Sequence, residues 1–107
     1  MSTAPRSQVF HLNAMLSYQE DAVVSRQITK VEAGNVTLFA FDQDQGLSEH
    51  TSPFDALALI LEGEAEVTIS GQPFMLGAGD AILMPANEPH ALKAQQRFKM
   101  LLTMLRA

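Results

Sequence analysis

Residues 64–84 read EAEVTISGQPFMLGAGDAILM, and this stretch decides the fold class. Its first seven residues alternate between polar and apolar side chains, which is the period of a β-strand with one buried face. Two tight turns follow, at residues 70–73 and 77–80, and each leads into another short apolar segment. Short strands joined by turns that contain Gly and Pro are typical of a β-sandwich or barrel.

The same pattern extends from this stretch in both directions. Strands are predicted at residues 22–32, 36–42, 55–62, 64–70, 74–76, 81–84, 90–96 and 98–105. Residues 8–16 carry apolar side chains at helical spacing and predict a short helix, whereas residues 43–53 are polar and interrupt the strands. No segment predicts a helix long enough for a parallel α/β sheet. The sequence therefore predicts an all-β fold with a short N-terminal helical segment.

The length and composition fit one small globular domain. The chain has 107 residues, so a single domain over residues 1–107 is expected, with residues 1–6 frayed. It contains no Cys, which excludes disulfides, Cys-based zinc sites and a cysteine nucleophile. No apolar run reaches the ~18–20 residues that span a bilayer, and the N-terminal sequence MSTAPRSQ lacks the pattern of a secretion signal. These features predict a soluble, cytoplasmic protein without a membrane partner.

The net charge of −5 is distributed unevenly along the chain. Residues 31–92 contain ten acidic residues and no Lys or Arg, and all seven basic residues lie outside this stretch. A protein that binds nucleic acid needs a basic face, so this distribution argues against a nucleic-acid partner. The acidic stretch is either a solvated surface that aids solubility or an anionic surround that favours neutral or cationic ligands.

Two segments within or overlapping the acidic stretch have the spacing of known motifs. Residues 46–63 contain Gly46, His50 and the strand-closing Gly63, and residues 79–94 contain Gly79, Pro85 and His90. These segments resemble the two characteristic motifs of the cupin superfamily (RmlC-like jelly rolls), in particular its small stand-alone bacterial members. Asn87 occupies the second glycine position of the second motif, and Asn tolerates the positive φ angle that such a position requires. The resemblance implies a jelly-roll barrel with a pocket between its two sheets.

The resemblance also implies a metal site, for which this chain has an incomplete set of ligands. Cupin motifs usually supply three histidines and one carboxylate. Here His50 and His90 match two of these positions, whereas Ser52 and Ala56 stand at the other two. Catalytic metal sites usually have three protein ligands, so two histidines alone would hold one divalent transition metal (Fe, Mn, Ni, Cu or Zn) weakly. The available side chains for a further ligand are Glu49, Asp55, Glu88 and His11. A neutral imidazole pair could also act as acid and base without a metal.

The inner wall of the barrel is predicted from the alternation of side chains along each strand. Its candidates are Phe39, Phe41, Leu59, Leu61, Ile69, Phe74, Ile82, Met84, Met100 and Leu102. This set is either packed core, because Met fills irregular gaps, or the lining of an apolar pocket. We expect core at the closed end of the barrel and a ligand pocket toward the other end, formed by His50, Ser52, His90, Phe41, Phe74, Met84 and Met100.

Residues 57–61 and 98–105 are apolar on both faces, which predicts burial against a second copy in a homodimer.

Three classes of function remain open at this point. The chain could be a small-molecule-binding barrel, a metal-dependent enzyme of the dioxygenase, isomerase or decarboxylase type, or a structural dimer. Ser52 and Ala56 disfavour the enzyme, and the retained His50 and His90 disfavour a purely structural role. The sequence favours the binding barrel and leaves the ligand's identity open.

Overall fold

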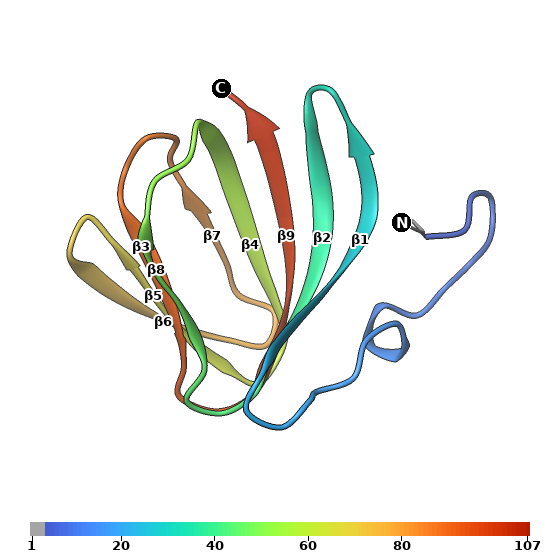
Figure 1. Cartoon of the computed structure of the whole chain (residues 1–107), viewed down its shortest axis with the longest axis horizontal. Helices are drawn as coiled ribbons and strands as arrows, with labels where there is room; N and C mark the ends of the chain where they lie inside the picture. Colours follow the sequence, from blue (N-terminus) through green and yellow to red (C-terminus); the bar gives the residue numbers. More distant parts are fainter. Residues whose placement is uncertain (1–3) are drawn as a thin grey trace.

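Nine β-strands in two facing sheets make up most of residues 4–107, which are the residues described by the computed structural model. The strands are β1 (Val23–Val31), β2 (Gly34–Phe41), β3 (Gly46–His50), β4 (Phe54–Glu62), β5 (Glu64–Ile69), β6 (Gln72–Gly77), β7 (Ala81–Met84), β8 (His90–Ala94) and β9 (Phe98–Arg106). A five-stranded sheet has the order β1-β2-β9-β4-β7, and a four-stranded sheet has the order β3-β8-β5-β6. The two sheets face one another (Figure 1). The predicted all-β jelly-roll architecture is confirmed.

A hydrophobic core fills the space between the two sheets. Phe41 of β2 and Phe98 of β9 are fully buried and stack with their ring centroids 4.4 Å apart. Ile60 of β4 packs in the same cluster, and Val67 of β5 reaches it from the four-stranded sheet. These side chains fix the distance between the sheets and therefore the frame on which the candidate site is built.

The predicted orientation of β4 is wrong by one residue. Leu59 and Leu61 are predicted to face the interior, but the buried residues of this strand are Ala56, Ala58 and Ile60. Because β4 carries apolar side chains on both faces, the hydrophobic pattern does not say which face points inward. The small side chains of β4 face the barrel interior, and the leucines lie on the outer face.

The chain passes from one sheet to the other at Gly63, between β4 and β5. This residue has a φ angle of +84°, and a Cβ atom built on it would lie 1.9 Å from the carbonyl oxygen of Arg97. Only glycine combines a left-handed backbone with so close a backbone approach. Gly63 therefore allows the abrupt change of direction between β4 and β5.

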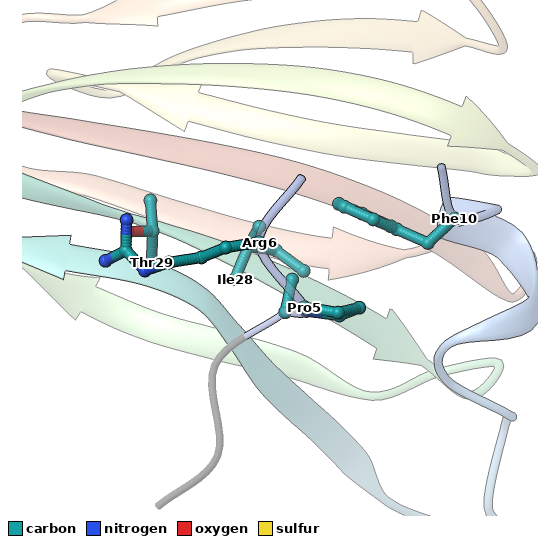
Figure 2. A pocket seen from close by; sticks show the side chains of 6 residues that line it. Pro5, Arg6, Phe10, Ile28 and Thr29 are labelled. Atoms are coloured by element: carbon teal, nitrogen blue, oxygen red, sulfur yellow. The ribbon is translucent and has the colours of Figure 1, made fainter. Parts of the chain in front are cut away.

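Residues 4–10 run beside β1, an edge strand of the five-stranded sheet, and form a small pocket with it (Figure 1 and Figure 2). The pocket has a volume of about 190 Å³, and Pro5, Phe10 and Ile28 are among its lining residues. Ile28 lies at a register shift in β1, and its carbonyl accepts a hydrogen bond from the N–H of Ala4 at 2.9 Å. The predicted frayed segment, residues 1–6, falls partly outside the described residues, which begin at residue 4.

The short helical segment predicted over residues 8–16 is present only as a single turn. The structure has only a three-residue 3-10 turn there, η1 (Leu12–Ala14), and the residue before it, His11, provides no side-chain cap. Isolated helices of this length are marginal because few hydrogen bonds offset the ordering of the chain. The segment is anchored instead by Lys99 of β9, whose Nζ donates to the carbonyl of Asn13 at 2.7 Å. No helix among the described residues is long and apolar enough to cross a membrane.

Candidate functional site

His50 and His90 lie directly opposite each other on neighbouring strands. His50 ends β3, His90 begins β8, and the two residues are partners in the antiparallel register. Their ring centroids are 4.4 Å apart, with an angle of 68° between the ring planes. β3 lies inside residues 43–53, which are predicted to interrupt the strands. It is a polar edge strand, and such strands lack a strong alternating pattern. Strand pairing thus joins two histidines that are far apart in the sequence.

Backbone carbonyl groups fix the orientation of both imidazole rings. The Nδ1 atom of His50 lies 2.7 Å from the carbonyl oxygen of Ser48, and Nδ1 of His90 lies 3.2 Å from that of Glu88. A carbonyl oxygen can only accept a hydrogen bond, so Nδ1 carries the proton in each of these pairs. In a neutral ring with this tautomer, Nε2 is an acceptor. Such a ring offers the lone pair of Nε2 to a ligand.

The two histidines differ in their exposure to solvent. His90 is buried, whereas His50 is exposed. Burial lowers the pKa of His90 below its usual value, the hydrogen bond to the Glu88 carbonyl opposes this change, and the nearby His50 lowers the pKa further. His90 is therefore neutral at neutral pH, and its Nε2 atom remains an acceptor.

The other two positions implied by the motifs hold side chains with little capacity to bind a metal. Ser52 lies between β3 and β4, and its hydroxyl accepts a hydrogen bond from the N–H of Phe54 at 3.4 Å. Ala56 lies on the inner face of β4 opposite Met84 of β7, with only 1% of its surface exposed. A neutral hydroxyl engaged in its own turn is a weak ligand for a transition metal, and a methyl group is none.

Of the four side chains considered as substitute ligands, Glu49 is exposed on β3 next to His50, and the other three are engaged elsewhere or exposed on another part of the chain. Asp55 accepts a hydrogen bond from the N–H of Ala86 at 2.9 Å, and Glu88 accepts one from the hydroxyl of Ser70 at 3.0 Å. His11 is exposed in the N-terminal segment. Within residues 4–107, no three His, Asp or Glu side chains are grouped so that they could hold a metal ion.

Comparison with known proteins identifies the family. The family model of the cupin domain matches residues 30–104, which is more than half of the chain. The chain belongs to the cupin family. The resemblance seen in the two motifs is thereby confirmed, and a search of curated proteins gave no match.

Two solved cupin-like structures cover nearly the whole chain. A conserved protein of unknown function from Streptococcus pyogenes is 34% identical to this cupin, with a TM-score of 0.91, and the match covers 100% of this chain and 96% of that chain. A cupin superfamily protein from Desulfitobacterium hafniense is 30% identical, with a TM-score of 0.91, and the match covers 99% of this chain and 97% of that chain. Both comparisons support the fold, and neither assigns a function.

The residues of this cupin do not fit the metal centre that the family's motifs usually build. Two imidazoles are in place, but the carboxylate position is the buried Ala56 and the remaining histidine position is Ser52. Catalytic metal sites require about three protein ligands to hold the ion and still leave a position open. The site is therefore a pair of oriented imidazoles without the rest of the metal-ligand set.

The side chains predicted to line the pocket divide between the core and the sheet edge. Phe41, Met84 and Met100 are almost completely buried and belong to the hydrophobic core. Phe74 is 36% exposed on β6, which is an edge strand of the four-stranded sheet. Alternation along a strand predicts the face on which a side chain lies, but it does not predict how far the two sheets separate at that point.

A pocket lined by two basic side chains and one acidic side chain, Glu32, lies at the end of the barrel, and the linear charge pattern gives no sign of it. Its volume is about 260 Å³, and its lining includes Lys30, Asn35, Phe54 and Arg106. The guanidinium of Arg106 lies 5.6 Å from the centroid of the Phe54 ring. Lys30 and Arg106 come together because β2 pairs with both β1 and β9. The sequence alone does not predict that Lys30 and Arg106 line one pocket, because this depends on the strand order.

Proposed function

We propose that this cupin binds a small molecule at the pair formed by His50 and His90, without the metal centre usual for the family's motifs. The observation that carries the proposal is the convergence of two imidazoles whose rings are each oriented by a backbone carbonyl. Their Nε2 atoms suit a ligand that donates hydrogen bonds, such as one with a hydroxyl, amide or amine group. Hydrogen bonds at partly desolvated groups are stronger than those in water, which favours such a ligand over solvent.

The surroundings of the pair favour a ligand that is partly apolar and not anionic. Ile69 of β5 is the strand partner of His90 on the side away from His50. A molecule that contacts the imidazoles next to this side chain gains apolar contact as well as hydrogen bonds. The stretch around the two motifs, residues 31–92, contains ten acidic residues and no Lys or Arg. Neutral and cationic molecules are therefore the expected class.

A ligand screen on the whole chain tests this proposal. Small alcohols, amides and amines are screened by ligand-detected NMR, and each compound that binds is retested with His50→Gln, His90→Gln and the surface control Glu64→Gln. We expect each histidine substitution to weaken binding by about tenfold, the loss of roughly one good hydrogen bond, with no effect of the control. Compounds that bind both histidine variants as well as the natural protein would contradict the proposal.

We also propose that two copies associate through the outer face of the five-stranded sheet. Leu57, Leu83 and Leu105 lie on this face and are 43%, 57% and 56% exposed, and Leu57 and Leu83 are directly opposite each other in the pairing of β4 with β7. Burial of each such side chain contributes about 1.5–3 kcal/mol at most. Light scattering should give a dimer mass for the natural protein and a monomer mass for Leu57→Glu. A natural protein that is monomeric at micromolar concentration would refute this association.

A further inference from the structure

A crevice separates the edge strands of the two sheets, β6 and β7, and it shares only Ile69 with the surroundings described above for the histidine pair. β6 is the last strand of the four-stranded sheet and β7 is the last strand of the five-stranded sheet. The crevice between them has a volume of about 440 Å³, which is within the range of small-molecule sites. Its walls include Ile69, Ser70, Phe74, Ile82, Leu83 and Glu88.

The apolar walls of the crevice are inner-face side chains that the core does not cover. Phe74 is the strand partner of the fully buried Val67, and Ile82 is the partner of the fully buried Ala58. Partners in an antiparallel pair project from the same face of the sheet, so Phe74 and Ile82 project from the inner faces. Because the sheets part at this flank, Phe74 is left 36% exposed. The crevice is thus an open edge of the core, and its exposed apolar side chains offer a contact surface for an apolar group.

One end of the crevice carries a negative charge. Glu88 lies in the loop between β7 and β8, and its Oε1 atom accepts a hydrogen bond from the hydroxyl of Ser70 at 3.0 Å. The ion pair found among residues 4–107 joins Arg97 to Asp42, so the Glu88 carboxylate has no basic partner within this part of the chain. No lining residue is Lys or Arg. The crevice therefore combines an apolar wall with a single oriented carboxylate.

We propose that this crevice binds a small organic ammonium ion with an aromatic or branched aliphatic body. The apolar body packs on Phe74 and Ile82, and the ammonium group pairs with the carboxylate of Glu88. Charge complementarity selects this occupant, because an anion would meet Glu88 with no cation to offset the repulsion. An exposed ion pair adds little by itself, so the apolar contact supplies most of the affinity and the carboxylate supplies the selectivity.

The experiment titrates the ¹⁵N-labelled full chain with three probes that share one aromatic body. The probes are 2-phenylethylammonium, the neutral 2-phenylethanol and the anionic 3-phenylpropionate. We expect saturable shifts at the amides of Phe74, Ile82 and Glu88 with the ammonium probe, with a dissociation constant in the high-micromolar to millimolar range. The neutral probe should bind about two- to fivefold more weakly, and the anion more weakly still. Added salt should narrow these differences.

Two variants assign the contributions of the two parts of the crevice. Glu88→Gln should abolish the preference for the ammonium probe while leaving the binding of 2-phenylethanol unchanged, and Phe74→Ala should weaken all three probes about tenfold. Glu64→Gln, which removes an exposed carboxylate elsewhere on β5, is the matched control and should change nothing.

The outcomes separate this inference from the function proposed for the histidine pair. Shifts centred on the rings of His50 and His90, with none at Phe74 and Ile82, would overturn the crevice as a binding site and would support the histidine site. Equal binding of the ammonium and anionic probes, or no saturable binding, would overturn the crevice proposal alone. If Phe74→Ala makes the free protein diffuse faster than the natural protein does, a second copy occupies the crevice in the natural protein. That result would also overturn the proposal.

Discussion

Restoring the two absent ligand positions should turn this cupin into a metal-binding protein. The double variant Ser52→His, Ala56→Glu supplies the histidine and the carboxylate that the motifs imply beside His50 and His90. Ala56 is only 1% exposed and has Met84 and Met104 as strand partners. Without a metal, the new carboxylate is a buried, unpaired charge that costs about 3–5 kcal/mol. This cost is a large part of the ~5–15 kcal/mol by which a domain is stable.

A divalent metal should recover most of that loss. Binding at a free metal concentration of about 100 times the dissociation constant adds about 2.7 kcal/mol of stability, which raises the Tm of a domain of this size by roughly 10–20 °C. The natural protein, with two imidazoles only, should shift far less because it lacks the third ligand.

Thermal unfolding with and without Zn²⁺, and again with a chelator, measures this effect. Ala58→Glu is the matched control, because it buries a carboxylate one inward position further along β4 and should be destabilised without recovery by metal. A natural protein that gains as much from Zn²⁺ as the double variant does would refute the claim that Ser52 and Ala56 leave the metal centre incomplete. A double variant that folds but gains no more than Ala58→Glu would refute the assignment of these two positions.

Three further results should follow from the structure. The folded-state pKa of His90 lies below the unfolded value of about 6.5, so the unfolded chain binds more protons in mildly acid solution. The contribution of neutral His90 to the free energy of unfolding should therefore be fully present above about pH 6.5 and be lost as the pH falls below it. Chemical denaturation should show a smaller fall in stability with pH for His90→Gln than for the natural protein. Tyr18→Phe removes a hydroxyl that donates to the Glu62 carboxylate at 2.6 Å, and the same assay should show a loss of about 1 kcal/mol, whereas an unchanged stability would mean that the N-terminal segment is not anchored there. Gly63→Ala should destabilise by more than about 2 kcal/mol, since its Cβ would meet the Arg97 carbonyl, and a loss of only a few tenths would contradict the backbone geometry at this turn.

Local sequence signals predict much of the strand layout and one backbone detail of the second motif. The clean alternation in residues 64–70 corresponds to β5 (Glu64–Ile69), and the apolar run at 55–62 corresponds to β4 (Phe54–Glu62). Asn87, which stands at a glycine position of the motif, has a φ angle of 67°, as expected for a residue that replaces glycine in the left-handed region. These features depend on a few neighbouring residues, so sequence alone suffices to predict them.

Features that depend on distant parts of the chain could not be predicted in this way. The inward face of β4 is decided by which side meets the four-stranded sheet, and Ala56 and Leu59 give no sign of it. The exposure of Phe74 depends on the gap between β6 and β7, which belong to different sheets. Motif resemblance placed His50 and His90 at a common site, but their 4.4 Å ring separation and their carbonyl partners come from the pairing of β3 with β8.

The central claim is that His50 and His90, each with Nδ1 directed at a backbone carbonyl, present their Nε2 atoms to a ligand in a site that lacks a metal centre. Long-range ¹H–¹⁵N NMR of the histidine rings, recorded on the full chain near neutral pH before and after addition of a compound from the screen, tests it most directly. We predict that His90 is the neutral tautomer with the proton on Nδ1, that the neutral form of His50 has the same tautomer, and that the Nε2 resonances of both rings move when the compound binds. A proton on Nε2 of His90, or Nε2 resonances that do not respond to any compound that binds the protein, would contradict the claim.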